Sequence, residues 1–267
     1  MSDLITINNL VIRYMQGGVF RKTFNDALKG VSLSIQKGDV VGLVGESGSG
    51  KSTLGRALLG LIEPHSGQID IAGVQPFGLQ GKERMAFCRK VQMVFQDTNA
   101  ALNPKMTVGA IIREGLDIHK IGTMEERDNR VTQLMNEVGL NISYRDRFPH
   151  ILSGGQRQRI NIARALALDP EILIADEPVS ALDVSIQRQV MDLLKELQSK
   201  RGLTMIFISH DLGVVKEYCN NLVILQNGEI MESGDTQRIF SKPESDYTQM
   251  LLDSIPIADP SVRNLVA

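Results

Sequence analysis

A glycine-rich segment between an apolar run and a helix-like segment constrains this chain most strongly. The segment consists of Gly45, Glu46, Ser47, Gly48, Ser49, Gly50, Lys51 and Ser52. Glycines have no Cβ, so the backbone can curl until successive N–H groups point inward. Together with the N-terminus of a following helix, these groups form a cradle for an anion. We expect Lys51 to reach the β- and γ-phosphates and the Ser52 hydroxyl to bind Mg²⁺, so the segment predicts a phosphate-binding loop.

Two other interpretations of these glycines are open. One is a dinucleotide-binding fingerprint, but residues 48–53 end in Thr53, where that pattern has glycine or alanine. The other is a chance match inside a solvated linker rich in glycine and serine. The strand–loop–helix context favours a nucleoside triphosphate, and we expect residues 45–53 to bind it.

The bulk composition argues against several classes of protein. With 29 basic and 31 acidic residues, the formal net charge of −2 provides no basic field for nucleic acid. No uncharged apolar run approaches the roughly 18 residues of a spanning helix, and residues 1–9 lack the pattern of a signal peptide. Cys88 and Cys219 have no companion cysteines at metal-ligand spacing. We expect a cytosolic protein with reduced thiols, whose role at a membrane would need a partner.

The order of apolar patterns predicts an α/β protein with an inserted helical lobe. Strands are expected at residues 4–14, 27–35, 40–44, 68–71, 91–95, 172–175, 204–208 and 222–225, and helices at 52–62, 184–199 and 212–218. Residues 15–26 are expected to form a hairpin loop. The alternation of strands and helices indicates a parallel sheet covered by helices. We expect one domain over residues 1–254, with the helical lobe at about 98–169, and a loosely ordered tail over 255–267.

Two adjacent carboxylates follow one of the apolar strands. Residues 172–175 lead into Asp176 and Glu177, and ligands of open α/β sheets bind at the C-terminal ends of strands. Successive strand side chains point to opposite faces, so the two acids can have different roles. We expect Asp176 to bind Mg²⁺, directly or through water, and Glu177 to orient and deprotonate the attacking water. A solvated turn is the alternative, and the phosphate loop upstream argues against it.

A second candidate anion site begins another helical segment. The residues are Leu152, Ser153, Gly154, Gly155 and Gln156. They place a hydroxyl and unobstructed N–H groups at a helix N-terminus. A plain serine and glycine helix start is the alternative. One chain thus holds two candidate phosphate-binding ends.

With these motifs the chain resembles an ATP-binding-cassette ATPase, whose signature is LSGGQ, as at residues 152–156. The resemblance covers nearly the whole chain. It implies a P-loop NTPase cassette with a mixed-sheet core, an N-terminal antiparallel β subdomain and an inserted helical lobe, and it implies ATP hydrolysis with Mg²⁺. Two cassettes of this family pair head to tail. Ser153, Gly154 and Gly155, with Gln156 completing the signature, would therefore contact the γ-phosphate of ATP held by the other subunit.

The resemblance assigns further roles. Gln96 matches the glutamine that senses Mg²⁺ and water and couples the two lobes, so it is expected to act in both catalysis and metal binding. His210 matches the histidine that contacts the γ-phosphate and Glu177. The loop that communicates across the dimer matches Ser180, Ala181, Leu182 and Asp183. Tyr14 lies where the family has an aromatic ring against adenine, with core packing at a strand end as the alternative.

Residues 45–50, 96–109 and 177–185 closely resemble the subgroup that imports peptides and nickel. The implied protein is the ATPase subunit of a bacterial importer on the cytoplasmic face of the inner membrane. Its expected partners are two transmembrane permeases, an extracytoplasmic substrate-binding protein and a second, related ATPase. Many peptide-importer members have a cysteine-bearing C-terminal segment, whereas no cysteine follows Cys219 here. Dipeptide, nickel and metal-chelate cargo are therefore open, and an exporter ATPase or a non-transport soluble cassette ATPase are the alternatives.

Overall fold

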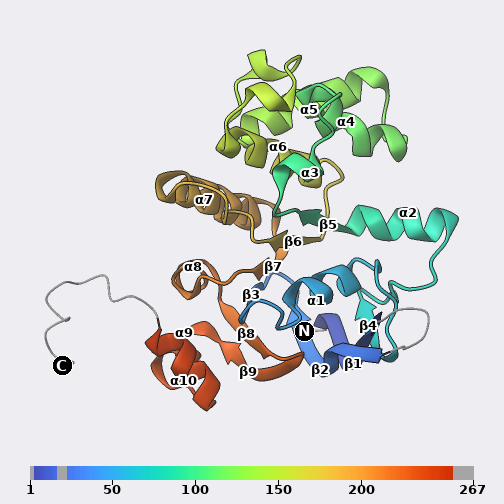
Figure 1. Ribbon diagram of the computed structural model, residues 1–267. Helices are drawn as coiled ribbons and strands as arrows, with labels where there is room; N and C mark the ends of the chain where they lie inside the picture. Colours follow the sequence, from blue (N-terminus) through green and yellow to red (C-terminus); the bar gives the residue numbers. More distant parts are fainter. Residues whose placement is uncertain (1–2, 17–22, 255–267) are drawn as a thin grey trace, which may run out of the picture.

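The structure is a computed structural model that describes residues 3–16 and 23–254. Its larger sheet has six strands in the order β5-β6-β7-β3-β8-β9 (Figure 1). The strands are β3 Val40–Val44, β5 Val91–Val94, β6 Ile172–Asp176, β7 Thr204–Ile208, β8 Asn221–Gln226 and β9 Glu229–Asp235. The first five in the sheet are parallel, and β9 pairs antiparallel with β8. The sheet is therefore mixed, as the family resemblance implies.

The smaller sheet is antiparallel and has the strand order β2-β1-β4. Its strands are β1 Asp3–Gln16, β2 Thr23–Gln36 and β4 Ser66–Ile71. The sequence predicts a hairpin loop over residues 15–26, but this range is too long, because the β1–β2 pairing continues past the pair Met15 and Phe24. The ion pair between Arg13 Nη2 and Asp26 Oδ2, 2.9 Å apart, joins the two strands near this end. The expected N-terminal antiparallel subdomain is confirmed.

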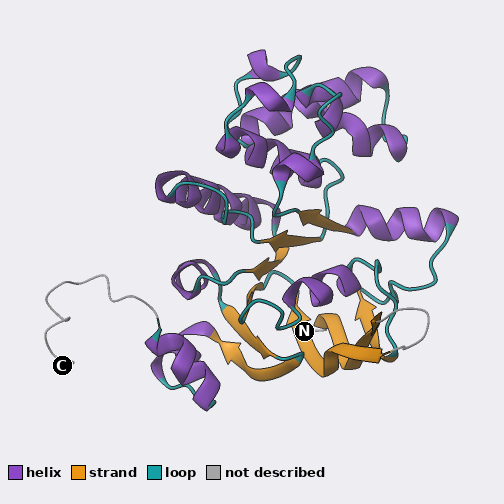
Figure 2. Cartoon of the chain, viewed as in Figure 1, coloured by secondary structure: helices purple, strands orange, loops and turns teal. Residues whose placement is uncertain are grey.

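Helices cover the mixed sheet and form a separate lobe (Figures 1 and 2). Around the sheet lie α1 Lys51–Leu58, α2 Gly81–Lys90, α7 Val184–Arg201, α8 Leu212–Tyr218, α9 Thr236–Ser241 and α10 Asp246–Asp253. The lobe consists of α3 Thr98–Ala101, α4 Val108–Ile118, α5 Met124–Glu137 and α6 Gly154–Leu166, with 3-10 turns at Ile142–Tyr144 and Pro149–Ile151. These helices fall within the lobe expected at residues 98–169.

Helix α1 is shorter than the sequence pattern predicts. It ends at Leu58 and not at residue 62. Gly60 adopts a φ of +63°, and its N–H donates to the carbonyl of Ala57 over 2.9 Å. A left-handed glycine ends a helix readily, so the chain turns here before it reaches Pro64.

Alternate strand residues face two separate apolar cores. In β6, Ile172 and Ile174 pack in the core between the mixed sheet, α1 and the antiparallel sheet. Leu173 and Ala175 pack in the core that continues under α7 and into the helical lobe. Burial on both faces explains why the strand reads as a continuous apolar run. It also fixes the C-terminal end of β6, and with it the two acids that follow.

Within residues 3–16 and 23–254, none of the helices combines the length and apolar character needed to cross a membrane.

Candidate functional site

The predicted phosphate loop connects β3 to the N-terminus of α1. Gly45 and Gly50 adopt φ values of +150° and +108°. A Cβ on Gly45 would lie 2.1 Å from the carbonyl oxygen of Leu225, and one on Gly50 would lie 2.7 Å from that of Ala27. Side chains are therefore excluded at both positions by backbone conformation and by contact. The loop is curled tightly against its neighbours, as an anion cradle requires.

Lys51 lies inside this loop. Its residue is 7% exposed, and Nζ donates to the carbonyl oxygens of Gly45 and Glu46 over 2.7 and 2.8 Å. Burial lowers the pKa of Lys51, and the carboxylates of Glu177, Asp176 and Glu46 oppose that shift. The ammonium group is thus held at the loop by oxygen atoms on several sides.

Asp176 ends β6 directly beside α1. Its carboxylate is buried, and Ser52 Oγ lies 3.5 Å from Oδ1. Burial raises the pKa of Asp176, as does the neighbouring charge of Glu177, while Arg56, Ser52 and Lys51 lower it. The net rise means that the protein only partly compensates this negative charge, which leaves the site suited to a cation.

Glu177 connects three of the predicted residues. Gln96 Nε2 donates to Glu177 Oε2 over 2.7 Å, and His210 Nδ1 lies 3.2 Å from Oε1. The Glu177 backbone has a φ of +42°, and its N–H donates to Ile208 at the end of β7 over 2.9 Å. At this turn the chain leaves the direction of strand β6, and the two side-chain contacts hold the Glu177 carboxylate in place. Residues from β5, β6 and β7 therefore meet at one edge of the sheet.

A cavity of about 440 Å³ lies where these elements meet. Its lining residues are Ala27, Ser47, Gly48, Gly50, Lys51, Ser52, Thr53, Gln96, Glu177 and His210. Gln96 also lines a neighbouring cavity of about 490 Å³, together with Arg56 and Asp176. The structure thus brings the phosphate loop, both acids, Gln96 and His210 together.

The signature lies outside this lining, at the N-terminus of α6. Ser153 and Gln156 form a capping box: Ser153 Oγ accepts from Gln156 N–H, and Gln156 Oε1 accepts from Ser153 N–H over 2.9 Å. A Cβ on Gly155 would lie 2.7 Å from Ile186 Cγ2, and one on Gly154 would lie 3.2 Å from Leu182. The signature therefore packs against the predicted communication loop and α7, and not against the phosphate loop of its own chain.

Two further predicted features have clear positions. Ser180 Oγ lies 3.4 Å from Gln96 Nε2 and donates to the carbonyl of Glu177 over 3.2 Å, so the predicted communication loop 180–183 begins beside Glu177. Tyr14 is half-buried in β1 and packs against the core between the sheets. It does not line the phosphate-loop cavity, and its contact with adenine stays a prediction.

The sequence motifs did not identify two side chains that fix the Gln96 segment. Asn161 Nδ2 donates to the carbonyl of Phe95 over 3.0 Å. Arg164 Nη1 donates to the carbonyl of Ala101 over 2.6 Å, and its guanidinium lies over the Phe95 ring. Both side chains come from α6 and are three residues apart, so they lie on one face of the helix, and this spacing is the signal that could have indicated them. They connect the helical lobe to the segment that follows β5 and contains Gln96.

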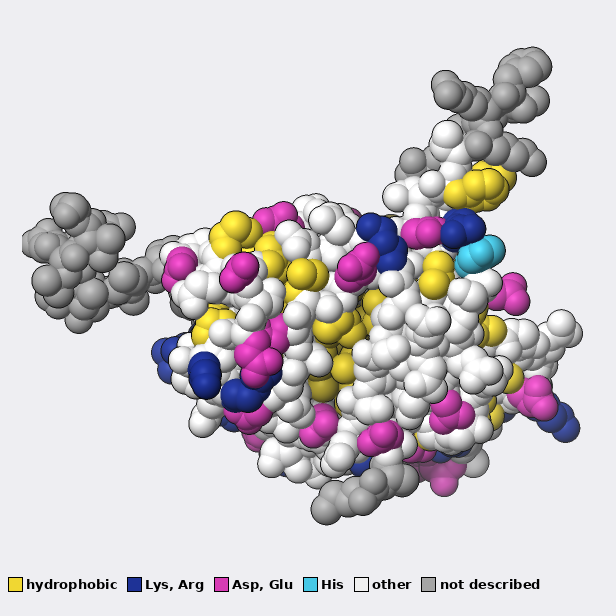
Figure 3. Space-filling view, turned by 90° about the horizontal axis from the view of Figure 1, so that it is seen from below, with side chains coloured by type: hydrophobic (Ala, Val, Ile, Leu, Met, Phe, Trp, Pro, Cys, Tyr) yellow, Lys and Arg dark blue, Asp and Glu magenta, His cyan; other side chains and the backbone are white. Residues whose placement is uncertain are grey.

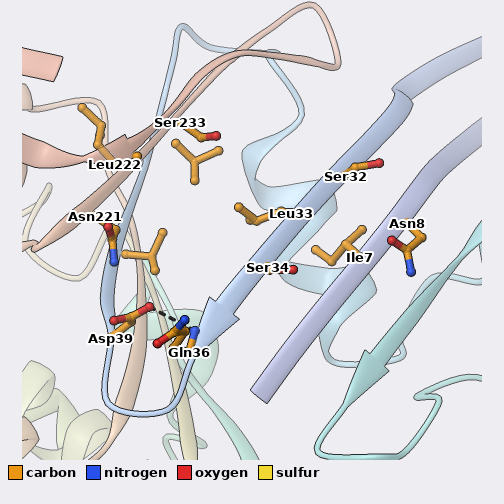
Figure 4. Close-up of a pocket in the computed structure, with 13 residues that line it drawn as sticks. Ile7, Asn8, Ser32, Leu33, Ser34, Gln36, Asp39, Asn221, Leu222 and Ser233 are labelled. Atoms are coloured by element: carbon orange, nitrogen blue, oxygen red, sulfur yellow. Dashed lines mark hydrogen bonds between the residues drawn. The ribbon is translucent and has the colours of Figure 1, made fainter. Parts of the chain in front are cut away.

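A larger cavity, of about 560 Å³, lies elsewhere, between β2 and strands β8 and β9 (Figure 4). Figure 3 shows the molecule from below, where β2 and β9 lie, with hydrophobic side chains near the middle of this face. Polar groups such as Ser32, Ser34 and Asn221 line the cavity, and Gln36 N–H donates to Asp39 Oδ2 over 3.0 Å. Among the described residues that line it, there is no predicted site residue and no basic side chain. Its size alone therefore does not make it the functional site.

The fold, the phosphate loop and the paired acids define a nucleotide-hydrolysing cassette, and family comparison agrees. The model of the family "ABC transporter" matches residues 28–180. The model "Oligopeptide/dipeptide transporter, C-terminal region" matches residues 231–267. The chain belongs to the ABC transporter family and is an ATP-binding ATPase of that family.

Individual relatives are similar over most of the chain. A putative peptide import ATP-binding protein of Brucella ovis is 50% identical over 262 residues, which cover 98% of this chain and 81% of the relative. The oligopeptide transport ATP-binding protein OppF of Bacillus subtilis is 50% identical over 243 residues, covering 90% of this chain and 80% of the relative.

Solved structures show the same fold. The dimeric post-hydrolysis state of the ATP-binding cassette MJ0796, bound to ADP and Pi, has a TM-score of 0.78 and 33% identity, covering 87% of this chain and 98% of that one. CbiO1 of Clostridium perfringens, part of an ABC transporter complex, has a TM-score of 0.79 and 28% identity, covering 99% of both chains. The predicted cassette fold is confirmed.

Proposed function

We propose that this chain is the ATPase subunit of an importer that takes up peptides through partner permeases. The observation that carries the proposal is that the candidate catalytic and metal-binding side chains lie together at the predicted phosphate loop. They are Lys51, Ser52, Asp176, Glu177 and His210. The C-terminal family match and the names of the relatives support import and peptide cargo. They lend no support to nickel, to an exporter ATPase or to a non-transport cassette protein. The missing cysteine after Cys219 therefore does not argue against a peptide importer.

Glu177 is the proposed general base for hydrolysis. Its carboxylate lies at the cavity and is oriented by Gln96 on one oxygen and His210 on the other. A base held in this way can direct a water molecule at the γ-phosphate and accept its proton. Lys51 and the loop N–H groups would stabilise the charge that develops on the phosphate oxygens.

Mg²⁺ is the proposed cofactor of this reaction. Asp176 and Ser52 offer oxygen atoms 3.5 Å apart, and burial, with the charge of Glu177, raises the pKa of the Asp176 carboxylate. A hard divalent cation prefers such oxygen ligands. Asp176, directly or through water, Ser52 and Gln96 would hold the ion, and its charge would neutralise that of the phosphates when bound.

A second cassette is proposed to complete the site. The signature residues lie outside the lining of their own chain's cavity, yet they present a helix N-terminus suited to an anion. Pairing with another cassette, head to tail, would place Ser153, Gly154 and Gly155 against ATP held there. A solved relative that is dimeric and bound to ADP and Pi supports the pairing of two cassettes. The second cassette is proposed to be a related but non-identical ATPase.

In the proposed assembly, two permeases contact the cassettes at the cytoplasmic face of the inner membrane, and an extracytoplasmic binding protein delivers the peptide. Residues 1–254 form one ABC ATPase domain in this proposal, with the helical lobe at about 98–169. The loosely ordered tail predicted over residues 255–267 lies outside the described residues. ATP-driven closure of the cassettes would move the helical lobes and, through them, the permeases.

Affinity purification of the tagged chain from its native membranes in mild detergent tests the assembly, with mass spectrometry of the bound proteins. We expect two permeases and a second ATPase, and a peptide-binding protein when the complex is cross-linked before extraction. Ribosomal or DNA-repair partners without permeases would overturn the transport proposal. If the complex contains a permease pair but its ATPase activity is stimulated by nickel and not by peptides, the proposal of peptide cargo is wrong.

A further inference from the structure

The side chain of Gln187 joins the first turn of α7 to the loop that precedes this helix. Its amide nitrogen Nε2 donates to the carbonyl oxygens of Val179 and Leu182, over 3.1 and 2.9 Å. Its backbone N–H donates to the carbonyl of Asp183 over 2.8 Å. One residue therefore fixes the main chain just before and at the end of the predicted communication loop 180–183.

The two residues that Gln187 binds also hold each other. Leu182 N–H donates to the carbonyl of Val179 over 3.1 Å, which closes a turn around Ser180. Val179 is 8% exposed, and the half-buried Leu182 packs against the same apolar core. Hydrogen bonds and apolar contacts on both sides of Ser180 leave the main chain between them little conformational freedom. The position of Ser180 is therefore set by this turn.

Ser180 connects the turn to the side chains proposed for hydrolysis. Its N–H and its hydroxyl both donate to the carbonyl of Glu177, over 3.3 and 3.2 Å. Its Oγ lies 3.4 Å from Gln96 Nε2, and the same amide nitrogen donates to Glu177 Oε2 over 2.7 Å. The three residues thus form a closed group of contacts, in which both the main chain and the carboxylate of Glu177 are held.

The same turn also contacts the signature at the start of α6. A Cβ on Gly154 would lie 3.2 Å from Leu182 Cδ2, and one on Gly155 would lie 2.7 Å from Ile186 Cγ2. Leu182 belongs to the turn, and Ile186 lies in the first turn of α7. A shift of the turn would therefore change a contact of the signature as well as the contacts of Ser180.

We propose that Gln187 is a positioning residue for ATP hydrolysis: it holds the predicted communication loop in the conformation in which Ser180 supports Glu177. Gln187 is not among the described residues that line the phosphate-loop cavity, so it acts through the loop and not by contact with ATP. The inference rests on the proposed role of Glu177 as the general base. It gives the start of α7 a role in setting the rate of hydrolysis.

Gln198, in the last turn of α7, offers a matched control. Its Nε2 also donates to two main-chain carbonyls, those of Gly38 and Leu203, over 3.0 Å each. Both glutamines are half-buried. Gly38 and Leu203 precede the parallel strands β3 and β7, whereas the phosphate loop and His210 follow these strands. Replacing either glutamine by Met therefore removes a similar pair of hydrogen bonds, near the site or far from it.

The first test compares Gln187→Met with Gln198→Met in the whole chain. ATP affinity and Tm are measured on the chain, and kcat and KM for ATP on the complex purified with its partners. We expect Gln187→Met to lower kcat by roughly 10- to 100-fold, because a misplacement of about 1 Å can cost a factor of about 100. Its KM and ATP affinity should stay close to the wild-type values, and its Tm close to that of Gln198→Met. Equal kcat values for the two variants would overturn the inference.

Ser180→Ala tests whether Gln187 acts through Ser180. Ser180 is exposed, so this variant should keep the wild-type Tm and still lower kcat. The double variant should have nearly the kcat of Gln187→Met alone, since the effects of residues that act through one another do not add. Independent effects, whose fold-changes multiply in the double variant, would contradict the proposed route.

Glu177→Gln separates this inference from the assignment of the base. If Glu177→Gln loses hydrolysis while Gln187→Met turns over as Gln198→Met does, the positioning role is wrong and the role of Glu177 stands. If Glu177→Gln itself hydrolyses ATP normally, the assignment of the base fails and the inference fails with it.

Discussion

Glu177 shows how a single side chain can be held ready for chemistry. One carboxylate oxygen accepts from Gln96 and the other faces His210, while a left-handed backbone turn sets the direction of the side chain. Gln96 lies just after strand β5, and His210 lies just after strand β7. The proposed catalysis by Glu177 would therefore depend on three strands keeping their register.

Replacing Glu177 by Gln should remove the base and keep its shape. We expect kcat for ATP hydrolysis to fall by roughly 10²- to 10⁴-fold, because an amide cannot accept the proton of the attacking water. ATP affinity should change little, since Lys51 and the loop are untouched. Steady-state ATPase assays and equilibrium ATP binding measure the two effects. Normal turnover by Glu177→Gln would remove Glu177 from the role of base.

At this scale the sequence predicted which residues would meet but not how. The spacing of Lys51 and Asp176 relative to their strands was enough to place both at one sheet edge. The contacts of Lys51 with the Gly45 and Glu46 carbonyls were not predictable, because they depend on loop backbone angles that only the folded chain defines.

At the scale of elements, a charge network joins the helical lobe to the core. Arg201, in the last turn of α7, contacts Glu137 of α5, and its Nη1 lies 2.7 Å from Asp169 Oδ1. Arg130 of α5 contacts the same Asp169. Asp169 lies in the connection from α6 to β6, so this network spans one of the two links between lobe and core.

Replacing Arg201 by Ala should destabilise the chain. Its side chain is 17% exposed, and its loss leaves the partly buried Glu137 without its cation. We expect the free energy of unfolding to fall by about 1–3 kcal/mol. Urea denaturation measures it, with Arg188→Ala as the control, because Arg188 is 74% exposed and its ion pair is 3.9 Å long. Equal stability of the two variants would mean that the network contributes nothing.

Glu232 should make the attachment of α10 sensitive to acid. Burial alone would raise its pKa, but hydrogen bonds, including those from Ser245 and Glu244, and the charge of Arg238 outweigh burial and lower it from 4.5. A carboxylate with a lowered native pKa stabilises the fold above its unfolded pKa, and this contribution is lost as the pH falls through the native value. The stability difference between wild type and Glu232→Gln should therefore be constant at neutral pH and shrink below about pH 4.5. Chemical denaturation across pH 3–7 measures it, and a difference that grows with acid would contradict the assignment.

Elements with strong apolar periodicity were predictable and those with weak periodicity were not. The strand at Thr204–Ile208 and the helix at Leu212–Tyr218 have the predicted bounds. Helix α2 and strand β9 were missed, because only Phe87 is buried in α2 and only Glu232 in β9. A buried glutamate gives no apolar signal, so the sequence cannot mark β9 as an edge strand of the sheet.

At the scale of the whole molecule, the phosphate loop and the signature of one chain lie in separate places. The phosphate loop lines a cavity together with Glu177, whereas the signature packs against Leu182 and Ile186. This separation is the structural reason for expecting a second cassette. It was predicted from the family resemblance, because no spacing in the sequence says which chain's ATP the signature contacts.

Replacing Ser153 by Arg should test which cassette the signature serves. We expect the isolated chain to bind ATP with unchanged affinity, while ATPase activity of the assembled complex falls by roughly 10²- to 10³-fold as a phosphate-stabilising donor is lost. Ser143→Arg, on an exposed turn, is the control for added charge. Calorimetry on the chain and turnover by the complex provide the readouts. Loss of ATP affinity in the isolated Ser153→Arg chain would place the signature at its own phosphate loop.

Uptake of a labelled oligopeptide by cells tests the central claim most directly. The cells would carry either the wild-type chain or Glu177→Gln as their only copy, with equal amounts of chain and permeases verified in the membrane fraction. We predict that uptake by the Glu177→Gln cells falls to the level of cells without the chain, because the variant assembly binds ATP but cannot hydrolyse it and so cannot complete its cycle. Uptake at the wild-type rate in the Glu177→Gln cells would contradict the claim that hydrolysis at this site powers peptide import.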